Sequence, residues 1–249
     1  MSYSQLDRSH LIATVGRLHD RIAERFPDAS LRSVAKELQR IASTHAERSA
    51  QIRRPVWHLR LWSALLLLGG AGLFGWLAWA MRLDPAAPVS GADGRAALGD
   101  TLQAIEAALA ILFFLSAAGV YVASLELRGK RRRCLEALHE LRALAHIVDM
   151  HQLTKDPERA LHAGGDRGDT ASSPERPLTP FLLTRYLDYC AEILSLIGKV
   201  AALYAQDFPD PQAVGAVDDI EDLTTGLSRK IWQKIMIVAN HPAVEGGKP

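Results

Sequence analysis

The amino-acid sequence predicts an all-α protein, in which a two-span transmembrane helical hairpin carries a cytoplasmic bundle or coiled-coil-like body formed by the N- and C-terminal segments. Three observations predict this fold. Two stretches of about twenty residues carry no charge. Elsewhere apolar residues recur at intervals of three and four, the period of a helix. No segment combines the alternation of a strand with turn signals at its ends.

Residues 1–54 are predicted to form a cytoplasmic αα-hairpin. Apolar residues recur at helical spacing on both sides of Phe26-Pro27-Asp28, a turn whose proline ends the first helix. Asp28 or Ser30 is expected to cap the second helix by accepting hydrogen bonds from its first backbone N–H groups. The second repeat contains a histidine among its apolar positions: Leu31, Val34, Leu38, Ile41, His45 and Ile52.

The uncharged stretches Leu61–Met81 and Ala107–Leu125 predict transmembrane helices over residues 56–81 and 101–126. At a rise of about 1.5 Å per residue each stretch covers about 30 Å, the thickness of the hydrocarbon core of a bilayer. Tryptophans favour the membrane–water interface. Four of them cluster near the two ends of the first stretch: Trp57, Trp62, Trp76 and Trp79.

Basic residues predict the orientation of the hairpin, because cytoplasmic flanks carry an excess of Lys and Arg. They are dense before the first span and after the second, and sparse in the connecting residues 82–100. Both termini are therefore expected in the cytoplasm, and residues 82–100 are expected to form an extracytoplasmic loop. Arg greatly outnumbers Lys, which favours a GC-rich bacterial genome and hence the bacterial inner (plasma) membrane.

After the second span, residues 127–154 predict a juxtamembrane cytoplasmic helix that continues across Gly129. Residues 155–179, rich in Gly and Pro, predict a flexible linker. Thr179-Pro180 then predicts a helix start, and residues 180–240 predict a second cytoplasmic αα-hairpin before a tail over 241–249. Its first helix carries two adjacent apolar repeats and is expected to be the core of the cytoplasmic body.

Small residues four apart allow helices in a membrane to approach closely. Each predicted span has one such pair, and the partner can be the other span or another subunit: Ala71 and Gly75 in the first, Gly119 and Ala123 in the second. An antiparallel hairpin also brings charged residues level at each membrane face. Two interfacial ion pairs are therefore expected: Arg60 with Glu126, and Arg82 with Glu106.

A basic cluster follows the second span, and it anchors the topology or binds anionic lipid head groups. The cluster consists of Arg128, Lys130, Arg131, Arg132 and Arg133. A nucleic-acid partner is not expected, because the chain has a net charge of only +1 and no recognised binding module.

No catalytic, cofactor-binding or metal-ligating residue is predicted. Gly70–Gly75 matches the dinucleotide pattern G-x-G-x-x-G, but it lies within a predicted span, where its N–H groups belong to the helix. His139, His146, Asp149 and His151 lack the spacing of a complete metal site. Cys134 and Cys190 occupy apolar helix positions and are expected to be reduced and buried. Arg167-Gly168-Asp169 is an RGD triplet that the predicted topology places in the cytoplasm.

These observations favour a non-enzymatic integral membrane protein. We expect a membrane-anchored scaffold, adaptor or regulatory subunit that binds a protein partner, or a second copy of itself, through its cytoplasmic helices. The alternative is an oligomeric pore or transport-associated subunit, since a two-span protein can enclose a pore only by oligomerising. Neither uncharged stretch contains a charged residue that could serve an ion or proton pathway, which disfavours the pore.

Overall fold

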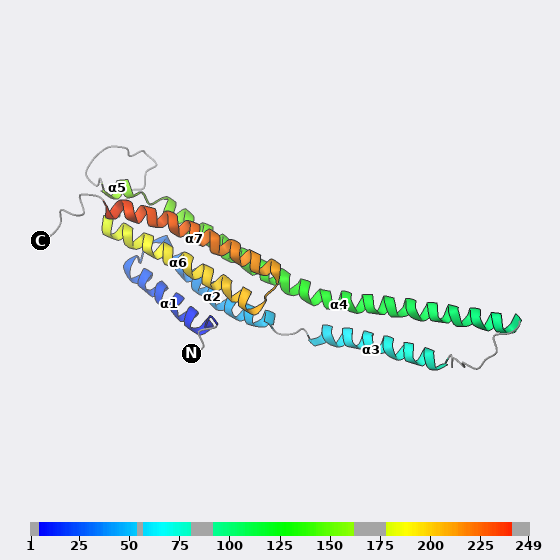
Figure 1. Cartoon of the computed structure of the whole chain (residues 1–249). Coiled ribbons are helices and arrows are strands. Elements are labelled where there is room, and N and C mark those ends of the chain that lie inside the picture. The colour runs from blue at the N-terminus through cyan, green and yellow to red at the C-terminus, as the bar shows by residue number, and fades with distance from the viewer. Residues whose placement is uncertain (1–4, 54–56, 81–91, 162–177, 241–249) are drawn as a thin grey trace. The chain divides into compact units, whose positions relative to one another are not determined.

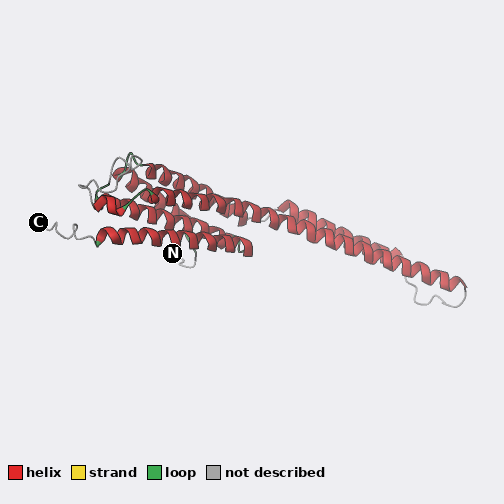
Figure 2. Cartoon of the chain, turned by 90° about the horizontal axis from the view of Figure 1, so that it is seen from above, coloured by secondary structure: helices red, strands yellow, loops and turns green. Residues whose placement is uncertain are grey.

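The structure is a computed structural model, and it describes residues 5–53, 57–80, 92–161 and 178–240. Every regular element in these ranges is a helix (Figure 2), which confirms the all-α prediction. The chain divides into two units, one made of Met1–Arg53 with Arg131–Pro249 and the other of Arg54–Lys130. Each unit is described by itself below.

The first unit, called the bundle from here on, is built from helices that lie side by side (Figure 1). Helix α4 (Ala92–Leu153) contributes its part from Arg131 onward. The other helices of the bundle are α1 (Arg8–Arg25), α2 (Ser30–Arg53), α5 (Pro157–Leu161), α6 (Pro180–Asp207) and α7 (Pro211–Ala239). Helices α1 and α2 therefore form one pair in contact, and α6 and α7 form another.

Contacts between side chains give the directions of the helices. Arg8 at the start of α1 contacts Asp207 at the end of α6, so these two helices are antiparallel. Helix α2 is antiparallel to α4, because Ser30 at its start contacts His151 near the end of α4. Helix α4 runs parallel to α7: Arg131 contacts Asp210 just before α7, and the last turn of α4 contacts Lys234 near the end of α7.

One cap predicted from the sequence accounts for the start of α6. Thr179 accepts a hydrogen bond from Leu182 N, and Pro180 occupies the first turn of α6, as predicted. Asp210 caps α7 in the same manner, with Pro211 after it. The capping role predicted for Ser30 is wrong, because Ser30 is the first residue of α2 and its hydroxyl contacts His151 instead.

Helix α6 forms the centre of the bundle, packing against α1, α2 and α7. A helix that is apolar around most of its circumference must be covered on more than one side, and both predicted repeats are covered here. All members of these repeats are buried except Leu182, which is partly buried and packs against the core. The first repeat consists of Leu183, Leu187, Cys190, Leu194, Ile197, Ala201, Tyr204 and Phe208, and the second of Leu182, Tyr186, Tyr189, Ile193, Leu196, Val200 and Leu203. The prediction that this helix is the core of the body is confirmed.

The second unit consists of α3 (Trp57–Ala80) and the part of α4 before Arg131. Among the described residues, one helical segment, within Ile105–Leu153, is long and apolar enough to cross a membrane. The apolar stretch found in α3, Leu61–Gly72, is shorter. One candidate span is therefore supported, and the two-span hairpin stays a prediction.

Two helix boundaries differ from those predicted. Helix α4 begins at Ala92, inside the range predicted as a loop, because the last proline before it is Pro88 and its interrupting glycines only weaken a helix. Helix α5 forms inside the predicted linker, where Pro157 begins a turn and Ala160 is buried against the core. The remaining linker residues, 162–177, lie outside the described residues, as does the tail over 241–249.

Candidate functional site

Helices α3 and α4 approach closely at two glycines in the second unit. A Cβ atom at Gly70 would lie 2.7 Å from Leu115 Cδ1, and one at Gly119 would lie 3.3 Å from Leu67 Cδ2. Of the four predicted helix-packing residues, Gly119 is thus at the contact between α3 and α4. Ala71 is exposed, as is Gly75, where an added Cβ would meet no atom within 4 Å. The side chain of Ala123 lies outside the described residues.

The predicted interfacial ion pairs involve side chains that are only partly described. Glu126 contacts Lys130 one turn further along α4, at 2.9 Å. Glu106 is exposed. The side chains of Arg60 and Arg82 lie outside the described residues.

Most members of the basic cluster are engaged by carboxylates of the chain itself. Lys130 pairs with Glu126, and Arg132 Nε donates to Glu136 at 2.8 Å. Arg131 belongs to the bundle, where its Nε and Nη2 donate to the two carboxylate oxygens of Asp210 at 3.0 and 2.6 Å. Arg128 and Arg133 are exposed, and they are the members best placed to meet an anionic surface.

Two arginines from other helices form ion pairs with the turn between α6 and α7. The Asp207 carboxylate, almost fully buried, accepts hydrogen bonds from Arg8, and Asp210 accepts them from Arg131. The hydrogen bond from Arg131 holds the pKa of Asp210 below its usual value. Charge-assisted bonds with two parallel donors fix geometry as well as energy. This turn therefore ties α1 and α4 to the end of the α6–α7 hairpin.

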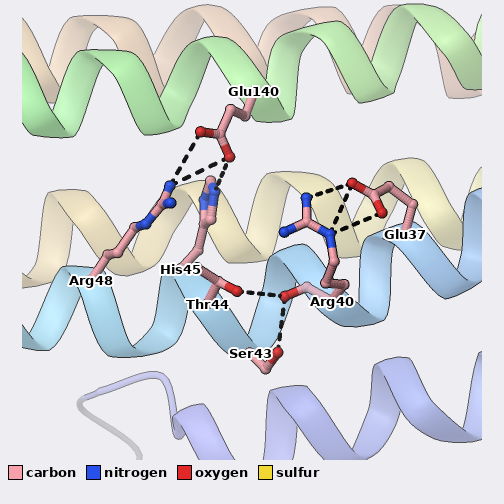
Figure 3. A network of polar contacts seen from close by, with 7 residues as sticks. All are labelled: Glu37, Arg40, Ser43, Thr44, His45, Arg48 and Glu140. Atoms are coloured by element: carbon pink, nitrogen blue, oxygen red, sulfur yellow. Dashed lines mark hydrogen bonds and ion pairs between the residues drawn. The ribbon is translucent and has the colours of Figure 1, made fainter.

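The central polar site of the bundle, called the α2–α4 seam below, joins α2 to α4 (Figure 3). His45 Nε2 lies 3.0 Å from Glu140 Oε2, and Arg48 Nη1 donates to the same carboxylate at 3.2 and 3.4 Å. At the start of α2, Ser30 Oγ lies 3.1 Å from His151 Nδ1. The seam consists of Ser30, His45 and Arg48 on α2 with Glu140 and His151 on α4.

His45 is the most enclosed member of the seam, with 0 % of its surface exposed. Its ring meets the ring of Tyr204 on α6 edge to face, at 5.7 Å between centroids. The Nδ1 atom of His45 and the hydroxyl of Tyr204 are both buried without a hydrogen-bond partner among the described residues. Buried polar atoms are rarely left unpaired, because each loses its hydration without compensation.

The seam perturbs the protonation of its own groups. Burial lowers the pKa of His45, against the opposing effect of Glu140. The hydrogen bond from His45 lowers the pKa of Glu140, with a further contribution from Arg48. Burial and the nearby Lys155 lower the pKa of His151. The arrangement therefore favours neutral histidines beside an ionised Glu140, and a proton is the species to which it can respond.

The predicted histidine group is spread over the surface of α4. His139 and His146 are exposed, Asp149 accepts a hydrogen bond from Gln152, and His151 belongs to the seam. Within the described part of the chain, no group of three or more His, Cys, Asp or Glu side chains is placed to hold a metal ion. Both cysteines are buried and reduced, and burial raises the pKa of Cys134 to about 11 and that of Cys190 to about 12. Thiols of such high pKa are poor nucleophiles near neutral pH.

The seam was not predicted from the sequence, although one signal of it was present. His45 occupies a position of the apolar repeat of α2, and a histidine there must find a polar partner or stay neutral. Nothing in the sequence identified Glu140 as that partner, because Glu140 is far from His45 in the chain.

Comparisons of the chain with protein-family models, curated proteins and solved structures found no match.

Proposed function

We propose that this chain is a non-enzymatic adaptor, scaffold or regulatory subunit, anchored in a bacterial inner membrane by a two-span hairpin, with its bundle in the cytoplasm. The bundle would bind another protein through its helix surfaces. The polar side chains described above support a structural use, because they pair helix with helix rather than converge on an open site.

Membrane insertion of α3 together with α4 is supported by both helices. Helix α3 runs from Trp57 to Ala80, long enough to cross a hydrocarbon core of about 30 Å. The sequence holds no charge between Leu61 and Ala80. Large apolar side chains are exposed on the second unit, as lipid-facing side chains must be: among them Leu65, Leu68, Phe113, Phe114 and Val120.

The observation that carries the binding role is a group of exposed apolar side chains at one end of the bundle. Met150 and Leu153 on α4 are 68 % and 64 % exposed, and Trp232 on α7 is 60 % exposed. Lys234 Nζ donates to the carbonyl oxygen of Gln152 at 2.8 Å, which brings these parts of α4 and α7 to the same level. Exposed Trp and Met are typical of protein-binding surfaces.

Site-specific photo-crosslinking in intact cells tests this role. A benzophenone amino acid in place of Trp232 should give an adduct with a different protein, identified by mass spectrometry. The same group in place of Asp222, an exposed residue ten positions before Trp232 on α7, serves as the matched control and should give little adduct. Adducts only between copies of this chain would favour the oligomeric alternative, and no adduct at position 232 would contradict the adaptor role.

A further inference from the structure

The α2–α4 seam depends on groups that change charge near neutral pH. Within the described ranges, the hydrogen bonds and ion pairs between α2 and α4 all include His45, His151 or Glu140. Helix α2 also packs along α1 and α6 through apolar side chains. A change in the charge of the seam would therefore act on one side of α2 only.

The geometry at His45 defines which nitrogen carries the hydrogen in its neutral form. Glu140 is a carboxylate that accepts, so Nε2 carries the hydrogen and donates it, and Nδ1 keeps its lone pair. A second proton would convert Nδ1 into an N–H group at a buried position where the described residues offer it no acceptor. Burying such an unpaired donor is unfavourable, because it loses its hydration without gaining a hydrogen bond.

The charged groups around His45 do not remove this penalty. On α2, Arg40 and Arg48 both oppose a positive charge on the ring. On α4, Glu140 favours that charge, but its carboxylate is already shared with Arg48. On α6, the facing group is the Tyr204 ring, whose pKa is raised by burial, so it stays neutral. Glu37, one turn before Arg40, is occupied by an ion pair with Arg40.

The second histidine of the seam, His151, is also disfavoured from taking up a proton. His151 contacts Ser30 at the start of α2, and burial together with the positive charge of Lys155, four residues further along the chain, disfavours its protonation. Tyr186 of α6 lies beside Ser30 and stays neutral because burial raises its pKa. Two histidines therefore hold α2 against α4 in their uncharged forms, one at the start of α2 and one further along it.

We propose that the α2–α4 seam is a pH-sensitive latch, in which protonation of His45, assisted by His151, separates α2 from α4 as the surrounding solution becomes acidic. A base whose pKa is lowered by docking binds its proton more weakly when docked, so docking is strongest above its free pKa and weakens as pH falls. The ordinary value for His45 is 6.5. Between pH 7.5 and 5.5 each histidine can shift the opening equilibrium by at most about tenfold.

Hydrogen–deuterium exchange on the full chain in lipid nanodiscs tests the latch. Protection of peptides from α2, corrected for intrinsic exchange rates, should fall several-fold between pH 7.5 and 5.5, up to about tenfold for each histidine. Peptides from α7 serve as the internal reference and should change little. In His45→Gln the side-chain amide can still donate to Glu140 but cannot titrate, so most of the pH response should disappear.

The control variant is His139→Gln, an exposed histidine of α4 outside the seam, which should respond like the unaltered chain. An unchanged pH response in His45→Gln would overturn the proposal, as would unchanged protection of α2 in the unaltered chain. Histidine NMR titration of the unaltered chain gives a second readout that does not depend on a variant. A pKa of His45 below 6.5 supports the latch, and a value at or above 6.5 overturns it.

Discussion

At the scale of single residues, the bundle contains several buried polar side chains. His45, Ser49, Gln152, Asp207, Asp210 and Thr224 are buried. Buried polar groups are tolerated when they are hydrogen-bonded, and removing one partner leaves the other with its desolvation penalty. The two aspartates meet this condition through arginines of other helices, and His45 meets it at one nitrogen only.

Asp210→Asn tests the value of the charge at the α6–α7 turn. Asparagine keeps the cap of α7, so the loss of stability should reflect the pairing with Arg131. The pKa of Asp210 is lowered on folding. Its contribution to the free energy of unfolding is therefore present at pH values above its ordinary pKa of 3.8, and it is lost as the pH falls through its pKa in the folded protein. The difference in unfolding midpoint between the two proteins should be constant from pH 5 to 8 and shrink below pH 4.

The exposed Asp218 on the same helix provides the control for this measurement. Asp218→Asn should leave the denaturant midpoint, followed by circular dichroism at 222 nm, within the error of the unaltered chain. An Asp210→Asn variant with the same midpoint as the unaltered chain would show that the pairing with Arg131 adds no stability.

At the scale of elements, α6 determines whether the bundle holds together, because it packs on α1, α2, α5 and α7. Leu194 lies at its centre and is fully buried. Leu194→Ala should lower the free energy of unfolding by about 2–5 kcal/mol. The substitution removes buried apolar atoms, and it also leaves a cavity in the core. Leu153→Ala, which removes the same atoms from an exposed site on α4, should change it by less than about 0.5 kcal/mol. Equal effects would contradict the central place of α6.

The contact between α3 and α4 can be tested in the same way with two neighbouring glycines. At Gly70 an added side chain meets Leu115 within 2.7 Å, whereas at Gly72 it meets no atom within 4 Å. Gly70→Ile should therefore push the helices apart, and Gly72→Ile should not. A disulfide introduced between Leu67→Cys and Gly119→Cys reports the approach, and its yield should fall in the first variant only. An equal yield in both would show that Gly70 is not a contact position.

At the scale of the whole molecule, the proposed topology depends on two spans with both ends in the cytoplasm. Alkaline phosphatase is active only after export, so a fusion after Pro88, between α3 and α4, should be active. A fusion after Lys248 should be inactive because it follows the second span. Activity of the second fusion with inactivity of the first would reverse the orientation and place the bundle outside.

Much of this fold follows from the sequence alone, because the signals involved are local. Helical periodicity, the Thr179-Pro180 start and the proline-bearing turns each depend on residues a few positions apart, and they predicted the helix pairs at both ends of the chain. The two apolar repeats of α6 predicted its burial on several sides. The errors occurred where local signals were weak, at Ala92, where α4 begins, and at α5 inside a Pro- and Gly-rich segment.

The tertiary structure alone decided which polar side chains meet. His45 with Glu140, Arg8 with Asp207 and Arg131 with Asp210 join residues far apart in the chain. Their distances depend on the order, direction and rotation of whole helices, which no local pattern encodes. The sequence by itself therefore determined that the chain is helical and where its apolar faces lie, while the packing of the helices determined where charges pair and where a histidine is buried.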